Sequence, residues 1–218
     1  MTETLHCPSC GAPVRVQNRY VKVVACEFCG QVGLLDGPRL DPTGRSAGLV
    51  DLPSPLYLDA TGRIEGRAFR VLGRLLYEYE GGAWHEWFVA FDGGDPGWLV
   101  EDEGRFSLLH KAPLTEPAPE YDRVDVGDVI ALLGREVFVT EKNEAVIAGG
   151  EGQLAFPIFP GERVRYLDGS AGEDQVGLEY ADDETEAFVG RALAREAVEV
   201  DDEVYGWEGG PEWTGSAR

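Results

Sequence analysis

Apolar and polar residues alternate along much of the stretch 66–106. Trp87, Val89 and Phe91 share one face of such an alternating segment, and their chain neighbours fall on the other face. A period of two is typical of strands in an antiparallel sheet. The glycine-rich gap at 92–97 supplies the backbone conformations that a tight reversal needs. The pattern therefore predicts a meander of short strands rather than a pair of helices.

The second half of the chain repeats this pattern. Its segment Leu133-Gly134-Arg135 echoes Leu72-Gly73-Arg74, and each motif is followed by an apolar, strand-like segment. Residues 184–198 also show helical spacing, but Gly190 favours a strand there. We interpret the body as a degenerate internal duplication. The predicted fold class is all-β, and the simplest architecture for the body is two SH3-like small barrels in tandem.

Four cysteines occur as two close pairs, and a glycine follows each pair. A CxxC turn places two sulfurs on one side of a tight loop. Two such turns build the tetrahedral four-sulfur site that structural Zn2+ prefers. The sequence therefore predicts one structural zinc ion per chain, bound by the metal ligands Cys7, Cys10, Cys26 and Cys29.

Other uses of these thiols fit the sequence less well. Four thiolates leave no open coordination position for catalytic zinc. A redox dithiol would need a single CxxC on a larger α/β scaffold. His6 adjoins Cys7, but the four sulfurs already fill the site, so it is expected to be a bystander. The segment is too small for a core of its own, so its folding is expected to depend on the metal.

Changes in composition divide the chain into six parts. Residues 36–55 are rich in proline and glycine and show little periodicity, which predicts a linker or surface strap. Three prolines interrupt the pattern again at 111–122. The expected organisation is a zinc ribbon at 1–35, a linker at 36–55, a first β unit at 56–110, a Pro-rich connection at 111–122, a second β unit at 123–199 and an acidic flexible tail at 200–218.

The charge is strongly acidic and unevenly distributed. The formal net charge is −21. The first fifty residues hold five basic and four acidic side chains, so the acidic excess lies in the rest of the chain. Such a body repels phosphate backbones and anionic membrane surfaces. The charge therefore predicts either solubility alone or a cationic partner.

The sequence favours a cytoplasmic protein. No hydrophobic run reaches the roughly 18–20 residues that span a bilayer. The first residues carry neither the basic start nor the apolar core of a signal peptide. Two close cysteine pairs fit a reducing compartment better than a disulfide framework. We expect no transmembrane segment, so any membrane link would run through partners.

Several short motifs in the central stretch resemble a bacterial domain family of unknown function, DUF4178. They are Gly73-Arg74, Trp84-His85-Glu86-Trp87, Phe91-Asp92, Gly97-Trp98-Leu99 and Gly104-Arg105-Phe106. The resemblance covers roughly residues 56–200, with His85 standing where the family pattern has an acidic residue. Members often carry an N-terminal double-CxxC ribbon. Relatives occur beside envelope-stress and polyamine-synthase-like proteins, so the resemblance implies a link to a membrane-associated stress system.

Motifs for catalysis are lacking. The chain has no phosphate-binding GxxxxGK, no GxSxG and no HExxH, and it has three histidines. We therefore expect a protein that is not an enzyme. Aromatic residues are the better candidates for contacts, because tryptophan commonly anchors interfaces. The candidate interaction residues are Trp84 and His85, expected at an exposed strand edge, and Trp207 and Trp213, expected in the flexible tail.

Three functions are compatible with these features. The leading hypothesis is a non-enzymatic adaptor or scaffold that binds a protein partner through the ribbon and aromatic strand edges. The second is a sensor that binds a cationic small molecule such as a polyamine in an acidic pocket. The third is nucleic-acid binding through Arg15, Arg19 and Lys22 of the ribbon, which the acidic remainder of the chain disfavours.

Overall fold

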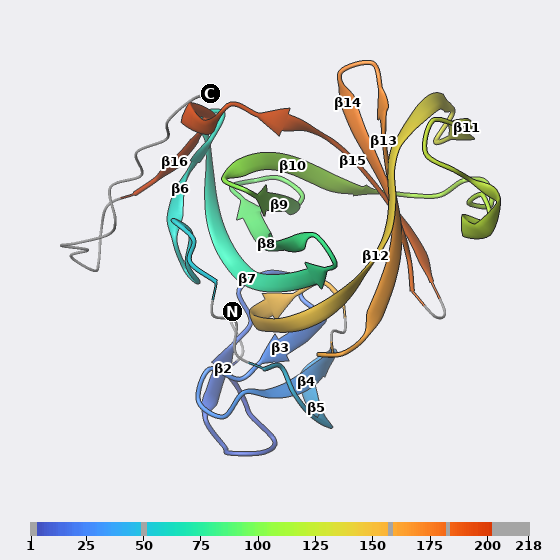
Figure 1. Ribbon diagram of the computed structural model, residues 1–218. Coiled ribbons are helices and arrows are strands. Elements are labelled where there is room, and N and C mark those ends of the chain that lie inside the picture. Colours follow the sequence, from blue (N-terminus) through green and yellow to red (C-terminus); the bar gives the residue numbers. More distant parts are fainter. Residues whose placement is uncertain (1–3, 49–51, 157–158, 182–183, 202–218) are drawn as a thin grey trace.

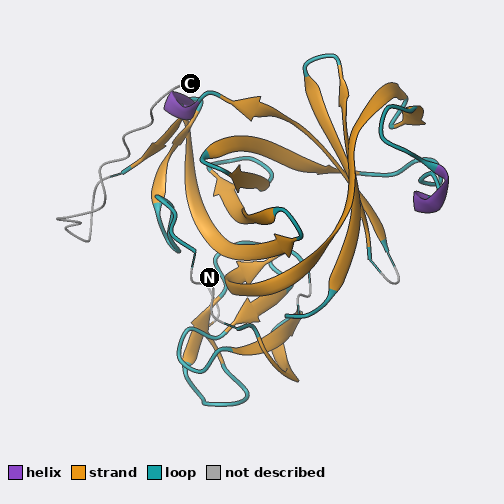
Figure 2. Cartoon of the chain, viewed as in Figure 1, coloured by secondary structure: helices purple, strands orange, loops and turns teal. Residues whose placement is uncertain are grey.

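The computed structural model describes residues 4–48, 52–156, 159–181 and 184–201. Within these ranges the chain is built of antiparallel strands and two short 3-10 turns, η1 (Tyr121–Arg123) and η2 (Arg195–Ala197). The prediction of an all-β fold is confirmed (Figures 1 and 2). No helix in the described ranges is long and apolar enough to cross a membrane.

Eight strands close into one antiparallel barrel. Each strand pairs with the next around the ring, and the closing pair is formed where β12 runs across to β7 (Figure 1). In ring order the strands are β7 (Arg67–Tyr79), β8 (Gly82–Phe91), β9 (Gly97–Asp102), β10 (Arg105–Ala112), β15 (Thr185–Leu193), β14 (Asp174–Tyr180), β13 (Arg163–Ala171) and β12 (Arg135–Leu154).

The two halves of the body share this barrel instead of forming two SH3-like barrels. Strands β7 to β10 form one meander and β12 to β15 form another, as their pairing shows. The meanders join through β10–β15 and β7–β12. A lone four-stranded meander would leave two unpaired edges, and joining the two removes all four. The closed ring therefore needs both halves.

The two Leu-Gly-Arg motifs do not occupy equivalent places. Residues 72–74 lie inside β7, at a register shift against β8. Leu133 and Gly134 form the turn from β11 (Val129–Leu132) into β12, with φ angles of 53° and 69°, and Arg135 is the first residue of β12. One motif belongs to a strand and the other to a tight turn, so this echo does not mark matching positions in the two halves.

Strand β8 is buried on both of its faces. One face, with Glu86 and Phe88, points into the barrel. The other, with Trp87 and Val89, joins a second hydrophobic cluster outside the barrel wall. The short strands β6 (Thr61–Ile64) and β16 (Val198–Val200) pair beside β7 and cover this outer cluster. The tryptophan-rich centre of the sequence is thus the wall between two cores.

The N-terminal module is a small ribbon attached to β12. Its strands are β1 (Thr4–His6), β2 (Pro13–Arg15), β3 (Val23–Ala25), β4 (Gln31–Asp36) and β5 (Arg39–Ser46). Strand β3 pairs with the end of β12, and the Gln153 amide donates to the Arg15 carbonyl at 2.8 Å. Val21 and Val24 of the ribbon belong to the same hydrophobic cluster as Leu75 and Phe88 of the barrel interior. Ribbon and barrel therefore pack as neighbours with a shared core.

The prediction of a linker at 36–55 is wrong for residues 39–46, which form β5. Strand β5 pairs with β4, and the Thr43 hydroxyl donates to the Val32 carbonyl at 2.7 Å. Proline is tolerated at position 42 because β5 is the outermost strand of its sheet, where an N–H facing away from the sheet has no ladder partner to lose. The proline and glycine content therefore marked an edge strand.

Candidate functional site

The four cysteines converge at the tip of the ribbon. The sulfurs of Cys7 and Cys29 are 3.7 Å apart, as are those of Cys10 and Cys26. All four sulfurs lie within 4.8 Å of one another. Tetrahedral bonds of about 2.3 Å from a central ion would place sulfurs about 3.8 Å apart. The cluster therefore fits a single metal ion held by four thiolates.

Two equivalent turns position these sulfurs. The Gly11 amide donates to the Cys7 carbonyl at 2.8 Å, and the Gly30 amide donates to the Cys26 carbonyl at 2.7 Å. Both glycines have positive φ angles, 75° and 68°, which other residues rarely adopt. The glycine after each cysteine pair thus has a backbone role. His6 is not part of the cluster.

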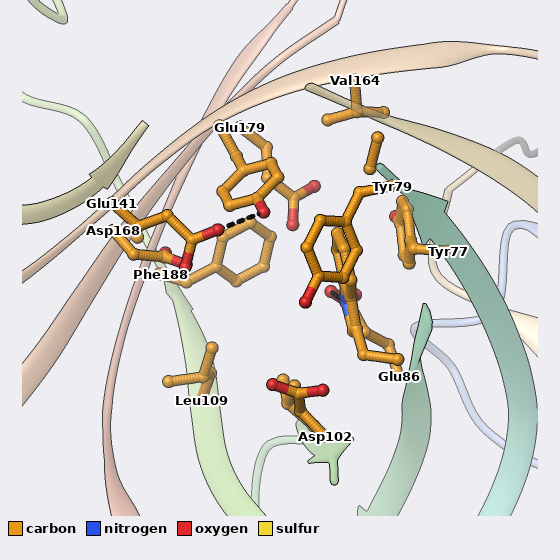
Figure 3. A pocket seen from close by; sticks show the side chains of 15 residues that line it. Tyr77, Tyr79, Glu86, Asp102, Leu109, Glu141, Val164, Asp168, Glu179 and Phe188 are labelled. Carbon is orange, nitrogen blue, oxygen red and sulfur yellow. Dashed lines mark hydrogen bonds between the residues drawn. The ribbon is translucent and has the colours of Figure 1, made fainter. Parts of the chain in front are cut away.

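A second site occupies the interior of the barrel. A cavity of about 130 Å3 is lined by side chains from all eight barrel strands. Carboxyl groups lie around its open centre, as Figure 3 shows. They belong to Glu86, Asp102, Glu141, Asp168 and Glu179. Among the described residues, no lysine, arginine or histidine lines the cavity. The wall therefore presents negative charge without a built-in counterion.

Aromatic rings form much of the remaining wall. The rings of Tyr77 and Trp84 stack with their centroids 4.9 Å apart and their planes 8° apart. Tyr166 meets Trp84 edge-on at 5.4 Å, and Tyr79 lies 5.6 Å from Trp84. Phe188 adds a further ring. The cavity thus combines carboxylates with aromatic faces, a combination that suits an organic cation.

Hydrogen bonds fix two of the carboxyl groups. The Trp84 indole donates to Glu86 at 3.0 Å, and the Tyr166 hydroxyl donates to Glu141 at 2.6 Å. The Tyr77 side chain, by contrast, is 1% exposed, and its hydroxyl has no hydrogen-bond partner among the described residues. Buried hydroxyls are normally paired. The unpaired Tyr77 hydroxyl is therefore an unused polar group at the cavity.

The surroundings keep protons on several of these acids. Burial, and then the charges of Asp168 and Glu186, raise the pKa of Glu86 to about 7, although the Trp84 hydrogen bond opposes the shift. Asp168 lines the cavity, where the surrounding protein partly removes it from water. This desolvation, followed by the charge of Glu141, raises the pKa of Asp168 to about 7. Burial and neighbouring carboxylates also raise the pKa of Glu179. Desolvation by the surrounding protein, followed by the charges of neighbouring carboxylates, accounts for all three shifts.

The predicted exposed strand edge at Trp84 and His85 is wrong. Strand β8 lies between β7 and β9, so it is not an edge. Trp84 lines the cavity, and His85 is 1% exposed on the opposite face of β8. There its Nδ1 lies 3.4 Å from Glu101. The other two candidate interaction residues, Trp207 and Trp213, lie outside the described residues.

The basic residues suggested for nucleic-acid contact are partly engaged within the protein. The Arg19 guanidinium donates to the Tyr20 hydroxyl at 2.8 Å and lies 3.8 Å from Asp95. The Arg15 carbonyl accepts the bond from Gln153 that ties the ribbon to β12. The Arg19 guanidinium therefore has partners within the fold, whereas the Arg15 contact involves only the backbone carbonyl.

Comparison with known proteins gives one match. No curated protein matches the chain, and no solved structure does. A family model described as a domain of unknown function, DUF4178, matches residues 58–195. This segment contains all eight barrel strands and the cavity they enclose, and it leaves out the four cysteines. Because the match spans more than half of the chain, the protein belongs to the DUF4178 family.

Proposed function

We propose that this protein binds an organic cation inside its barrel and that its cysteine cluster is a structural zinc site. The observation that carries the proposal is the cavity wall, which presents five carboxyl groups and several aromatic rings. A binding site is normally a cavity with a few converging polar groups and titratable residues whose pKa values are shifted. The barrel interior has each of these features.

A cation would relieve the electrostatic cost of the empty cavity. Desolvation, followed by the charges of neighbouring carboxylates, raises the pKa values of Glu86 and Asp168 to about 7. A bound ammonium or guanidinium group would supply an opposite charge, and the tyrosine and tryptophan faces would attract it further. Lys111 is engaged elsewhere, in ion pairs with Glu184 and Glu186. The cation is therefore expected to come from a ligand.

The arrangement favours an organic cation over a metal ion. Among the described residues, only the four cysteines bring three or more ligand atoms close enough to hold one ion. The cavity carboxylates come from five strands around the wall, and only Glu141 and Asp168, which pair across β12 and β13, lie side by side (Figure 3). A cavity of about 150 Å3 can hold a benzene molecule. A volume of about 130 Å3 therefore limits the enclosed part of the ligand to a similar size.

Calorimetry with small amines tests this function. The probes are spermidine and 1,4-diaminobutane, with 1,4-butanediol as the neutral control, all at one ionic strength. We expect saturable binding of the amines, no binding of the diol, and at least tenfold weaker amine binding by Glu179→Gln. The proposal would be contradicted if sodium chloride at equal ionic strength gave the same saturable heat as the amines. It would also be contradicted if Glu179→Gln bound the amines as tightly as the wild-type chain does.

Protein binding through the ribbon is a second candidate function, and one observation favours it. Phe28 stands between Cys26 and Cys29 and is 71% exposed. An exposed ring beside a rigid metal-bound turn is a suitable anchor for a partner. Affinity capture with the whole chain and with Phe28→Ser tests this adaptor function. If Phe28→Ser captured the same partners to the same extent as the wild-type chain, the adaptor function would be contradicted.

A further inference from the structure

One residue of the cavity wall carries a polar group that no described side chain satisfies. The Tyr77 side chain lines the cavity, and its hydroxyl is buried and has no hydrogen-bond partner among the described residues. Its ring is stacked on Trp84, so the hydroxyl cannot turn away without breaking that contact. Trp84 in turn donates to Glu86. The hydroxyl and the carboxyl group are thus held by the same indole.

Burial and carboxyl groups of the barrel raise the pKa of this hydroxyl. Burial, followed by the charges of Glu86, Glu179 and Glu186, raises the pKa of Tyr77 well above its usual value. The phenol therefore keeps its proton and offers both an O–H donor and an oxygen acceptor. Glu86 and Glu179 offer acceptors once they are ionised. The cavity wall thus combines several acceptors with one spare hydroxyl, and none of the described residues that line it is a cation.

We propose that the part of the cavity lined by Tyr77, Glu86 and Glu179 recognises an ammonium group by its N–H bonds, so that the cavity selects primary amines over quaternary ammonium ions. The inference rests on the proposed cation-binding function and deepens it. A primary ammonium has three N–H donors, which match the carboxylates of Glu86 and Glu179 and the Tyr77 hydroxyl oxygen. A quaternary ammonium has the same charge and no donor. It would leave the Tyr77 oxygen without a hydrogen bond and would give the carboxylates of Glu86 and Glu179 no new donor, and an unpaired buried polar group is costly inside a protein.

Aromatic walls alone would give the opposite preference. A site built only of rings attracts quaternary ammonium ions through their charge. Here one ring carries a hydroxyl that is unpaired among the described residues, and the indole on which that ring stacks donates to the buried Glu86. A site with unsatisfied polar groups strongly rejects a ligand that cannot pair them. The selectivity therefore depends on the Tyr77 oxygen as well as on charge.

Two ligands that differ only at the nitrogen test the inference: butylammonium and butyltrimethylammonium. Calorimetry at constant ionic strength measures the ratio of their dissociation constants for the wild-type chain, Tyr77→Phe and Tyr121→Phe. Tyr121 donates to the Asn143 carbonyl and does not line the cavity, so its variant is the matched control. We expect wild type and Tyr121→Phe to favour butylammonium at least tenfold, and Tyr77→Phe to reduce this ratio several-fold.

The outcomes separate this inference from the function on which it rests. If both ligands bind equally and Glu179→Gln abolishes their binding, the cation site stands and N–H recognition is wrong. If neither ligand nor the diamine binds, the cation site itself is wrong. The wild-type chain and Tyr77→Phe could also show the same large ratio of dissociation constants. The size of the methyl groups alone would then explain the selectivity, and the inference would be overturned. Thermal melting of Tyr77→Phe should show no loss of stability, because the deleted hydroxyl makes no hydrogen bond.

Discussion

The indole nitrogen of Trp84 donates a hydrogen bond of 3.0 Å to Glu86, two residues further along β8. Both side chains line the cavity, and the indole also stacks on Tyr77. One residue therefore links the aromatic and acidic parts of the wall. This link holds Glu86 in a fixed position in a site that raises its pKa to about 7.

Cation binding should strengthen as the pH rises from 6 to 8. Glu86 and Asp168 have pKa values of about 7 in the free protein, so each is partly protonated in this range. An ammonium ligand with a pKa of about 10 stays charged throughout and must displace those protons. Each displaced proton changes the affinity by up to about tenfold per pH unit. Calorimetry in buffers of different ionisation enthalpy should detect proton release, and an affinity that is flat over this range would contradict the expectation.

The ligand-free protein should lose stability as the pH rises from 5 to 8, and Glu179→Gln should reduce that loss. The folded carboxyl groups hold protons near pH 6 that the unfolded chain has released, because their folded pKa values are raised. The stabilisation that these retained protons provide is present in full below the pKa of the carboxyl groups in the unfolded chain. It is lost as the pH rises through their pKa in the folded protein. At pH 8 we expect Glu179→Gln to be more stable than wild type, because it removes a carboxylate whose pKa is raised in the folded state. Urea denaturation measures the difference. Glu136→Gln, on the exposed side of β12, is the control, and it should follow wild type.

Gly177→Ala should weaken ligand binding without removing a charge. A Cβ atom at this position would lie 3.0 Å from the Asp168 carboxylate oxygen, so the carboxyl group would have to shift. Gly177 lines the cavity, and its φ angle is one that alanine adopts freely. We expect a several-fold loss of amine affinity with little change in melting temperature. Unchanged affinity would show that the ligand does not reach Asp168.

Glu101→Ala should destabilise the outer wall of the barrel. Glu101 accepts hydrogen bonds from the Ser54 hydroxyl at 2.5 Å and the Trp87 indole at 3.0 Å, and it lies 3.4 Å from His85. Trp87 is fully buried, and in the variant its indole N–H would lose the one hydrogen-bond acceptor that it has among the described residues. An unsatisfied buried donor costs about 1–3 kcal/mol. Chemical denaturation should show a loss of at least this size. Exposed Glu103→Ala is the control, and an equal effect of both variants would refute the explanation.

The sequence was sufficient to predict the local structure but not the closure of the barrel. Alternating residues predicted the strands, and the spacing of the cysteines predicted their convergence, because both features depend on near neighbours. The β7–β12 pair joins residues such as Leu75 and Gly150, which lie far apart along the chain. No local pattern specifies such a pairing. The prediction of two separate barrels was wrong for this reason.

The sequence did not reveal the cavity for the same reason. Alternation places His85 and Glu86 on opposite faces of β8, but both faces are buried, so the pattern cannot tell which one lines the cavity. The available signal was the presence of single acids within apolar strands, such as Glu179 in β14. Acids there are costly unless they face a cavity or a partner. The acidic net charge pointed to a cationic ligand but not to its location.

Removal of the metal should weaken the barrel as well as the ribbon. Cys26 and Val24 belong to the same hydrophobic cluster as Leu75 and Trp98 of the barrel, so unfolding of the ribbon would expose part of the barrel core. Elemental analysis should find one zinc ion per chain, and a chelator or Cys26→Ser should lower the free energy of unfolding by about 4 kcal/mol or more. Amine affinity should fall with it, because Tyr77 and Trp84 pack in or against that cluster. Phe28→Ser, which changes an exposed ring on the same turn, should retain both zinc and amine binding. Full amine affinity in a metal-free, unfolded-ribbon protein would show that the barrel folds independently of the ribbon.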